Sequence, residues 1–482
     1  MTKKKSKAKV MLSAFSIILI LIFGLGILSH LLPNAQFVGD EIVNGSGTVG
    51  ASLSDILLSP ILGFESAVDV AIFTLVLGAF LAIVNRTGAL ETGVKVLVQK
   101  LKGRELILIP ILMLIFSIGG TTYGMLEETV GFYVLLAATM MAAGMDPLVG
   151  SATILLGAGS GVLGSTINPF ATGAALSALP ESVAFNQGLV ILIATFLWLT
   201  TLLISIFFVM SYAKKVKEDK GSTFLSLREQ KAAEKKFGGY ASKAEKKAEL
   251  TTNQKITLIL FGLTFVVMIV GFIPWGEFGI TFFDGFTGWL TGASLGNWWF
   301  YESALWFVIM SIIIGIVNKM GESGIVDAFV DGADDMVGVI LIIAIARGAT
   351  VLMEVTYLDN YIIYNAAELL SKVPEFLFVP FNYILHIVLS VLVPSSSGLA
   401  SLSTPIIGSL AGQLNYSSEV TVMTLVAANG LVNLITPTCG AIMGGLALAK
   451  VEYSTWFKWA LKVVLTIAVV NILILTIFSF II

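Results

Sequence analysis

Cysteine and histidine are almost absent from this chain of 482 residues, which has one cysteine, Cys439, and two histidines, His30 and His386. A single cysteine excludes a disulfide bond within the chain. The histidines lie far apart in apolar runs, so we expect no His/Cys metal site and no resident cofactor. The sequence also lacks a Walker A motif and a Ser-His-Asp-like arrangement, which argues against ATP-driven transport and against an enzyme.

Charged residues are scarce as well, and this excludes a water-soluble fold. Only 12% of the residues are charged and 56% are hydrophobic, with a mean hydropathy of +0.94, whereas soluble domains carry about 25% charged residues. So much apolar surface requires lipid, and we expect an all-α polytopic membrane protein. The apolar run 10–32 is long enough to cross a bilayer and no small-residue cleavage site follows it, so it is expected to remain as the first helix.

Lysine and arginine mark the cytoplasmic side of a membrane protein. Five lysines precede the first helix and place the N-terminus in the cytoplasm, whereas segment 33–65 has no basic residue and is expected outside. A span over 67–84 then returns inward to Arg86. Segment 275–300 is again free of Lys and Arg and rich in tryptophan, which is typical of an external loop with interfacial aromatics. We therefore expect a multi-pass protein of the cytoplasmic (inner) membrane.

The longest polar stretch, residues 213–255, holds 12 of the 28 basic residues with acidic residues between them. This mixture indicates a solvated cytoplasmic linker, and the interrupting carboxylates argue against a nucleic-acid partner. The linker divides the chain into four parts. These are an N-terminal helix with an external segment (1–65), a first membrane repeat (66–212), the linker (213–255) and a second membrane repeat (256–482).

Each half contains segments whose composition interrupts a helix. Small and polar residues surround Pro169 in the first half and Pro437 in the second, and paired interruptions of this kind indicate a transporter site near the membrane midplane. The broken spans are expected at 147–180 and 418–447. Segments 84–88 and 317–321 also resemble each other weakly.

The positions of Lys and Arg further predict a re-entrant hairpin before each broken span, at 105–146 and at 375–413. The first hairpin is expected to break at the Gly-Gly-Thr-Thr run 119–122. The two hairpins must enter from opposite sides, so the halves are predicted to be inverted-topology repeats. Segment 338–372 is expected to cross once and to unwind in its middle, with two short passes as the alternative.

Carboxylates at membrane depth are the sharpest functional signal, because a buried charge is costly unless it is paired, protonated or facing a cavity. Glu127 and Glu128 follow the first break directly. Either they bind a cationic group or a coupling proton, or they stabilise the start of the next helix. Arg347 either pairs with Glu354 or holds a substrate carboxylate. His386 is expected to be a hydrogen-bonded helix residue, and Cys439 a small packing residue.

Four motifs carry a family resemblance: 119–129 (GGTTYGMLEET), 161–173 (GVLGSTINPFATG), 393–403 (VPSSSGLASLS) and 430–438 (GLVNLITPT). They resemble the YfcC branch of the anaerobic C4-dicarboxylate carrier (DcuC-like) family, within the ion-transporter superfamily. The resemblance implies an inverted-repeat carrier that works by an elevator mechanism as a homodimer. It also implies a substrate region made of Thr121, Thr122, Glu127, Glu128, Asn168, Thr172, Ser395, Ser396, Ser397, Thr436 and Thr438, to which the sequence adds Arg347 and Glu354.

Two substrate classes follow from these residues. The acidic residues at depth favour a secondary active transporter that exchanges a basic amino acid of the arginine/ornithine type. The Ser/Thr-rich tips and Arg347 favour instead the uptake of an anion such as a C4-dicarboxylate, coupled to Na⁺ or H⁺. A channel and an intramembrane enzyme are more distant alternatives. At Glu354-Val-Thr the chain departs from the Asn-Asp-Gly of its relatives. If this segment contacts the ligand, the substrate of the relatives does not carry over to this chain.

Overall fold

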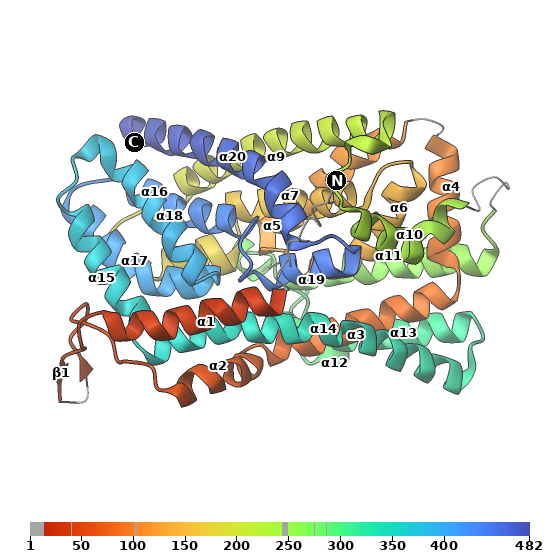
Figure 1. Ribbon diagram of the computed structural model, residues 1–482, viewed down its shortest axis with the longest axis horizontal. Coiled ribbons are helices and arrows are strands. Elements are labelled where there is room, and N and C mark those ends of the chain that lie inside the picture. Colours follow the sequence, from red (N-terminus) through yellow and green to blue (C-terminus); the bar gives the residue numbers. More distant parts are fainter. Residues whose placement is uncertain (1–13, 40, 102–103, 243–248, 274, 286) are drawn as a thin grey trace, which may run out of the picture.

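The computed structural model describes residues 14–39, 41–101, 104–242, 249–273, 275–285 and 287–482 (Figure 1). The N-terminal lysines that orient the chain in the sequence-based prediction lie outside these ranges. The described chain is helical apart from a short hairpin of β1 (Phe37–Val38) and β2 (Glu41–Ile42), in which Phe37 pairs with Ile42.

The first half contains a hairpin (α5–α6), an interrupted helix (α7–α8) and the long helix α9. Its elements in chain order are α1 (Ala14–Leu31), α2 (Leu53–Ser66), α3 (Val68–Arg86), α4 (Ala89–Leu101), η1 (Glu105–Ile107), α5 (Leu108–Tyr123), η2 (Glu127–Gly131), α6 (Phe132–Ala142), α7 (Pro147–Gly164), η3 (Pro169–Gly173), α8 (Ala174–Ser177), α9 (Gln187–Glu218), η4 (Lys220–Ser222) and α10 (Leu227–Ser242).

The remaining elements make up the second half of the chain. Its elements are α11 (Thr252–Phe272), η5 (Trp275–Phe278), α12 (Gly288–Thr291), α13 (Phe300–Val317), α14 (Gly321–Val355), α15 (Leu358–Leu370), α16 (Glu375–Leu392), α17 (Ser396–Gln413), α18 (Ser418–Val432), α19 (Gly440–Ala449) and α20 (Tyr453–Ile481). Helices α1, α2, α3, α13 and α14 lie on one side of the bundle in Figure 1, and α9 and α20 lie on the other.

Side-chain caps explain where several helices begin. Asp146, Asn186 and Ser417 each accept hydrogen bonds from backbone N–H groups at the starts of α7, α9 and α18. Thr251 and Gln254 form a capping box at the start of α11. These short polar residues satisfy N–H groups that have no partner within the helix, and they therefore fix the helix boundaries in the sequence.

Eight of the described helices are long and apolar enough to cross a membrane. Helices α9 and α20 pack against each other, and on their outer surface Leu203, Phe207, Leu465 and Leu473 are more than half exposed. Apolar faces of this extent are not stable in water. The prediction of an all-helical, multi-pass membrane protein is therefore confirmed, apart from the two short strands.

The expected interruption in the middle of segment 338–372 is present, although α14 is continuous through Gly348 and ends only at Val355. Gly348 instead permits close contact between α14 and α2. A Cβ atom there would lie 2.7 Å from the carbonyl oxygen of Ser59, and a Cβ atom at Gly63 would lie 2.3 Å from that of Ala344. The interruption comes at Tyr357, whose φ of 53° separates α14 from α15.

We expect the Gly348→Ala substitution to lower the free energy of unfolding by about 1–3 kcal/mol, because the added methyl group overpacks the α2–α14 crossing. Gly338→Ala is the matched control on the same helix, since a Cβ atom there meets nothing within 4 Å. Thermal unfolding in detergent measures both variants. Equal stability of the two would show that the crossing relaxes without cost.

The first hairpin also breaks later than predicted. Helix α5 runs through 119–122 to Tyr123, and the chain turns at Gly124, whose φ is 81°. Gly120 serves close packing: a Cβ atom there would lie 2.1 Å from the carbonyl oxygen of Ala158 on α7. The break therefore falls immediately before Glu127, which becomes the first residue of η2.

Segment 213–255 is not a fully solvated linker as predicted. Helix α9 continues to Glu218, and α10 packs one face against α6, with Ala233 and Phe237 at most 1% exposed. The buried carboxylate of Glu229 accepts hydrogen bonds from the backbone N–H of Glu452 (2.8 Å) and from the hydroxyl of Thr455 (3.1 Å). Helix α10 therefore joins the two halves at the turn between α19 and α20.

Because Phe237 is fully buried, we expect Phe237→Ala to lower the free energy of unfolding by about 3–5 kcal/mol. Lys235→Ala is the control on the exposed face of the same helix. The measurement is thermal or denaturant unfolding of the whole chain in detergent. An equal effect of the two substitutions would contradict the docking of α10.

Candidate functional site

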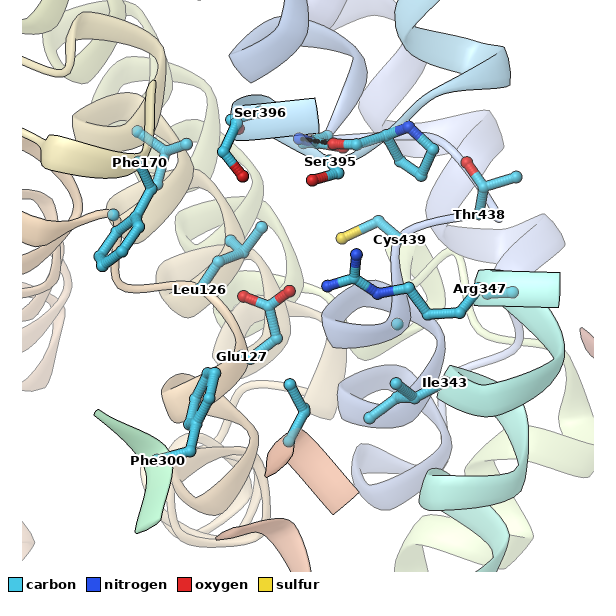
Figure 2. A pocket seen from close by; sticks show the side chains of 18 of the residues that line it. Leu126, Glu127, Phe170, Phe300, Ile343, Arg347, Ser395, Ser396, Thr438 and Cys439 are labelled. Atoms are coloured by element: carbon cyan, nitrogen blue, oxygen red, sulfur yellow. Dashed lines mark hydrogen bonds between the residues drawn. The ribbon is translucent and has the colours of Figure 1, made fainter. Parts of the chain in front are cut away.

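A cavity of about 170 Å³ lies where both interrupted helices, both hairpins and the long helix α14 meet. Its walls come from segments that are far apart in the sequence. The residues that line it are Val70, Gly124, Leu126, Glu127, Val162, Asn168, Phe170, Trp299, Phe300, Ile343, Ala346, Arg347, Pro394, Ser395, Ser396, Ser397, Asn433, Thr438, Cys439 and Gly440 (Figure 2).

Two opposite charges face each other in this cavity. Figure 2 shows the carboxylate of Glu127 and the guanidinium group of Arg347 pointing toward one another from opposite walls. Glu127 owes its position to the left-handed turn at Gly124, which ends α5. Arg347 projects from the middle of α14, and both residues are half-buried. Charges buried in a membrane protein are costly unless a partner or a ligand compensates them, so the pair makes this cavity the candidate binding site.

The tip of the second hairpin supplies hydroxyl and amide groups. Ser395 caps α17 by accepting a hydrogen bond from the N–H of Gly398 (3.3 Å). The hydroxyl of Ser396 donates to Oδ1 of Asn429 (2.6 Å), and Nδ2 of Asn433 donates to the carbonyl oxygen of Pro394 (3.0 Å). These bonds hold the hairpin tip against α18. The N-termini of α17 and α19 both begin at this wall, where backbone N–H groups favour an anion.

The first interrupted helix forms the facing wall. Nδ2 of Asn168 donates to the hydroxyl of Ser165 (2.9 Å), and Oδ1 of Asn168 accepts from the N–H of Phe170 (2.9 Å). Behind this wall the hydroxyl of Thr121 accepts from the N–H of Thr166 (3.0 Å) and ties the hairpin to the break. The non-helical backbone at this depth is therefore satisfied by local side chains.

The structure brings together seven of the thirteen predicted site residues. Those that line the cavity are Glu127, Asn168, Arg347, Ser395, Ser396, Ser397 and Thr438.

Five of the other six predicted residues are described and do not line the cavity. Three of them are buried and form hydrogen bonds within the breaks. Thr121 bonds to the hydroxyl of Thr166, and Thr172 donates to the carbonyl oxygen of Ser165. Thr436 bonds to the hydroxyl of Thr438. The hydroxyl of Thr122 donates to the carbonyl oxygen of Ile118 on its own helix. Glu354 is exposed near the end of α14. The side chain of Glu128 lies outside the described part of the chain.

His386 and Cys439 were not predicted as ligands, and only Cys439 lies at the cavity. His386 is a buried, hydrogen-bonded helix residue, as expected: its Nδ1 lies 2.9 Å from the carbonyl oxygen of Asn382 and its Nε2 lies 2.8 Å from the hydroxyl of Ser403. Cys439 was expected only to fill space in the packing. It is 6% exposed and lines the cavity between Glu127 and Arg347.

Sequence reasoning missed the aromatic wall and one amide. Trp299 and Phe300 come from a segment that was interpreted as an external loop with interfacial tryptophans, and Phe170 follows the proline of the first break. These three residues come together only through tertiary packing, so no local sequence pattern predicts their proximity. Asn433 was visible as part of the second break but has no distinguishing local signal.

The described helices form a multi-span membrane protein with a partly polar cavity, and comparison with known sequences identifies its family. The sequence model described as "C4-dicarboxylate anaerobic carrier" (DcuC) matches residues 4–479. The chain therefore belongs to the DcuC family of secondary transporters.

Two curated relatives are similar over most of this chain. An uncharacterized protein of Haemophilus influenzae is 29% identical over 416 residues, which cover 86% of this chain and 75% of the relative. A protein of Escherichia coli K12 named "Putative basic amino acid antiporter YfcC" is 26% identical over 407 residues, which cover 82% of this chain and 74% of the relative.

Two solved structures of transport proteins resemble the fold. The YdaH transporter of Alcanivorax borkumensis aligns over 97% of this chain and 98% of its own, with a TM-score of 0.46 and 14% identity. MtrF of Neisseria gonorrhoeae aligns over 98% of this chain and 96% of its own, with a TM-score of 0.44 and 17% identity.

Proposed function

We propose that this chain is a basic amino-acid antiporter, which exchanges substrates of the arginine/ornithine type across the cytoplasmic membrane. The observation that carries the proposal is the opposition of Glu127 and Arg347 in one cavity (Figure 2). An amino acid has both an anionic and a cationic end, and it matches a site with one charge of each sign. The name given to the Escherichia coli relative agrees with this assignment.

The carboxylate of the substrate is proposed to bind at Arg347. A guanidinium group offers two parallel N–H donors to a carboxylate. The N-termini of α17 and α19, with Ser395 and Thr438, add partial positive charge and hydroxyl donors at the same wall. The cationic end then faces Glu127 across the cavity.

A C4-dicarboxylate is the second candidate, and the description of the family supports it. Arg347 and the two helix N-termini suit one of its carboxylates. The other would lie near Glu127, where two like charges 4 Å apart repel by about 4 kcal/mol at an effective dielectric constant near 20. This candidate therefore requires a protonated Glu127 or a coupling cation, whereas the carboxylate and the side-chain cation of a basic amino acid match the two charges of the site.

We further propose that the two halves are inverted-topology repeats with re-entrant hairpins. The order of elements supports this: α4 and α15 have 13 residues each, the hairpins α5–α6 and α16–α17 follow them, and long helices α9 and α20 end each half. In Figure 1 helices α4 and α15 lie at opposite ends of the bundle. The proposed division into segments 1–65, 66–212, 213–255 and 256–482 follows this order approximately, because α9 extends past residue 212 to Glu218.

Transport is proposed to follow an elevator mechanism in a homodimer, with the N-terminus in the cytoplasm. The hairpins and interrupted helices would move as one body against the layer of α3, α13 and α14. The cavity lies at the boundary between these two groups, because Arg347 and Phe300 belong to the second and the serines and asparagines to the first. Na⁺ or H⁺ is the coupling ion if transport is not a pure exchange.

Counterflow in liposomes tests the substrate assignment. Purified protein is reconstituted with unlabelled ornithine or succinate inside, and the uptake of labelled arginine or succinate is followed. We expect arginine uptake that depends on internal ornithine. Succinate exchange without arginine exchange would reject the antiporter proposal and favour the dicarboxylate carrier.

A further inference from the structure

An aromatic wall borders the acidic end of the cavity. The rings of Phe170 and Trp299 lie 4.4 Å apart between centroids, and those of Trp299 and Phe300 lie 4.6 Å apart. All three residues line the cavity together with Glu127. Figure 2 shows Phe170 and Phe300 on the same side of the cavity as Glu127 and away from Arg347. The acidic end is therefore both negatively charged and aromatic.

The rings are held in place by polar and packing contacts. Nε1 of Trp299 donates a hydrogen bond to Oδ2 of Asp69 (3.0 Å), and the backbone N–H of Trp299 donates to Glu302 (2.8 Å). Phe300 is 5% exposed and packs against Phe73, with 5.5 Å between ring centroids. The wall thus presents ring surface at fixed positions and does not depend on a flexible loop.

Aromatic faces attract cations because their π-electron density is negative, and they do so without accepting a directional hydrogen bond. A carboxylate beside such faces adds charge attraction. This combination suits organic cations whose charge is spread over carbon-bound hydrogens, including quaternary ammonium groups. A small hydrated ion gains much less from ring surface.

We infer that Phe170, Trp299, Phe300 and Glu127 form a cage for the cationic head of the substrate, and that the site accepts zwitterions with an N-methylated or quaternary ammonium head. The inference rests on the proposed function, because it assumes that the cationic end lies at Glu127 and the carboxylate at Arg347. It deepens that proposal by adding a class of ligands and three specificity-determining residues.

The cage also spans the boundary between the two groups of helices. Glu127 and Phe170 belong to the hairpin and the interrupted helix of the first half, whereas Trp299 and Phe300 precede and begin α13. A relative movement of the two groups would separate the rings from the carboxylate. The cationic head is consequently bound by all four residues only in the arrangement described here.

Ligand-induced thermal stabilisation of the full chain in detergent tests the cage, because each ligand raises the melting temperature according to its affinity. The probes are lysine, Nε-trimethyllysine, the neutral tert-butyl analogue of trimethyllysine, and succinate. We expect lysine and trimethyllysine to bind with Kd values within about tenfold of each other, and both cations to bind more tightly than the neutral analogue.

The Trp299→Leu substitution should reduce the preference for trimethyllysine over its neutral analogue by about 3- to 30-fold. Trp299→Phe keeps a ring and should retain most of the preference, which separates the effect of the ring from that of the bond to Asp69. Trp289→Leu is the matched control, because Trp289 lies in the preceding segment and is 82% exposed. It should leave the preference unchanged.

The results distinguish the cage from the proposed function. Stabilisation by lysine with no binding of trimethyllysine, or an unchanged preference in Trp299→Leu, overturns the cage and leaves the amino-acid assignment intact. Stabilisation by succinate but by none of the amino acids overturns both.

Discussion

Glu127→Gln is expected to lower kcat/KM for arginine exchange roughly 10- to 150-fold, because hydrogen bonds to charged groups contribute about 1.5–3 kcal/mol each. The substitution keeps the size of the side chain and removes the charge that faces the cavity. Counterflow of labelled arginine against internal ornithine measures the effect. Thermal unfolding of the same sample shows whether the variant is folded.

Glu354→Gln is the matched control for this experiment. It removes the same charge from an exposed position on α14, outside the cavity, and should leave exchange unchanged. Normal exchange by Glu127→Gln would mean that this carboxylate only stabilises the start of η2, which is the alternative that the sequence leaves open. The observed direction of the carboxylate, into the cavity, supports the ligand role.

Arg347→Ala should weaken binding of arginine at least about 30-fold, because removing one partner of a buried, hydrogen-bonded charge pair costs 2–5 kcal/mol or more. Arg347→Lys keeps the charge but loses the two-pronged geometry, and it should fall between the alanine variant and the wild type. Arg86→Ala is the control, since Arg86 is half-exposed in its ion pair with Asp331 and such pairs contribute little.

The methyl ester of arginine makes the test of Arg347 specific. The ester has no carboxylate, so it should bind wild type and Arg347→Ala with similar affinity, whereas arginine should discriminate strongly between them. Equal losses for arginine and its ester would mean that Arg347 supports the structure of α14 rather than the substrate.

The sequence predicts the class of fold well because apolar excess and interrupted segments have direct physical causes. Long apolar runs must be helical in lipid, and polar breaks at this depth must line a cavity or pack against protein. Glu127, Arg347 and the serines 395–397 were predicted on these grounds, and they line one cavity. Their common position follows from the expectation that interrupted segments meet.

The error in placing the break of the first hairpin arises because glycine can either end a helix or allow another helix to pack closely. Gly120 was interpreted as part of a break, yet it lies in continuous helix and permits close approach of another backbone, as Gly348 does in α14. A sequence does not distinguish these uses, because the distinction depends on what packs against the glycine. Only Gly124, with its positive φ, ends a helix in the predicted region.

Other features depend on long-range packing alone. The weak likeness of segments 84–88 and 317–321 does not follow the order of elements: the first joins α3 to α4, whereas the second joins α13 to α14. The aromatic wall at Trp299 is likewise created by contact between distant segments. Neither the correspondence between elements of the two halves nor the aromatic wall can be recognised from a local sequence pattern.

The contact between α10 and the start of α20 can form only late in the synthesis of the chain. Glu229 bonds to the backbone of Glu452, which is 223 residues later in the chain. At about 5–20 residues per second, the ribosome needs roughly 10–45 s to make that stretch. During this time the carboxylate of Glu229 lacks both partners at the α19–α20 turn, although α6 is already present to receive Phe237. The start of α20 thus completes the docking of α10 and joins the first half of the chain to the second.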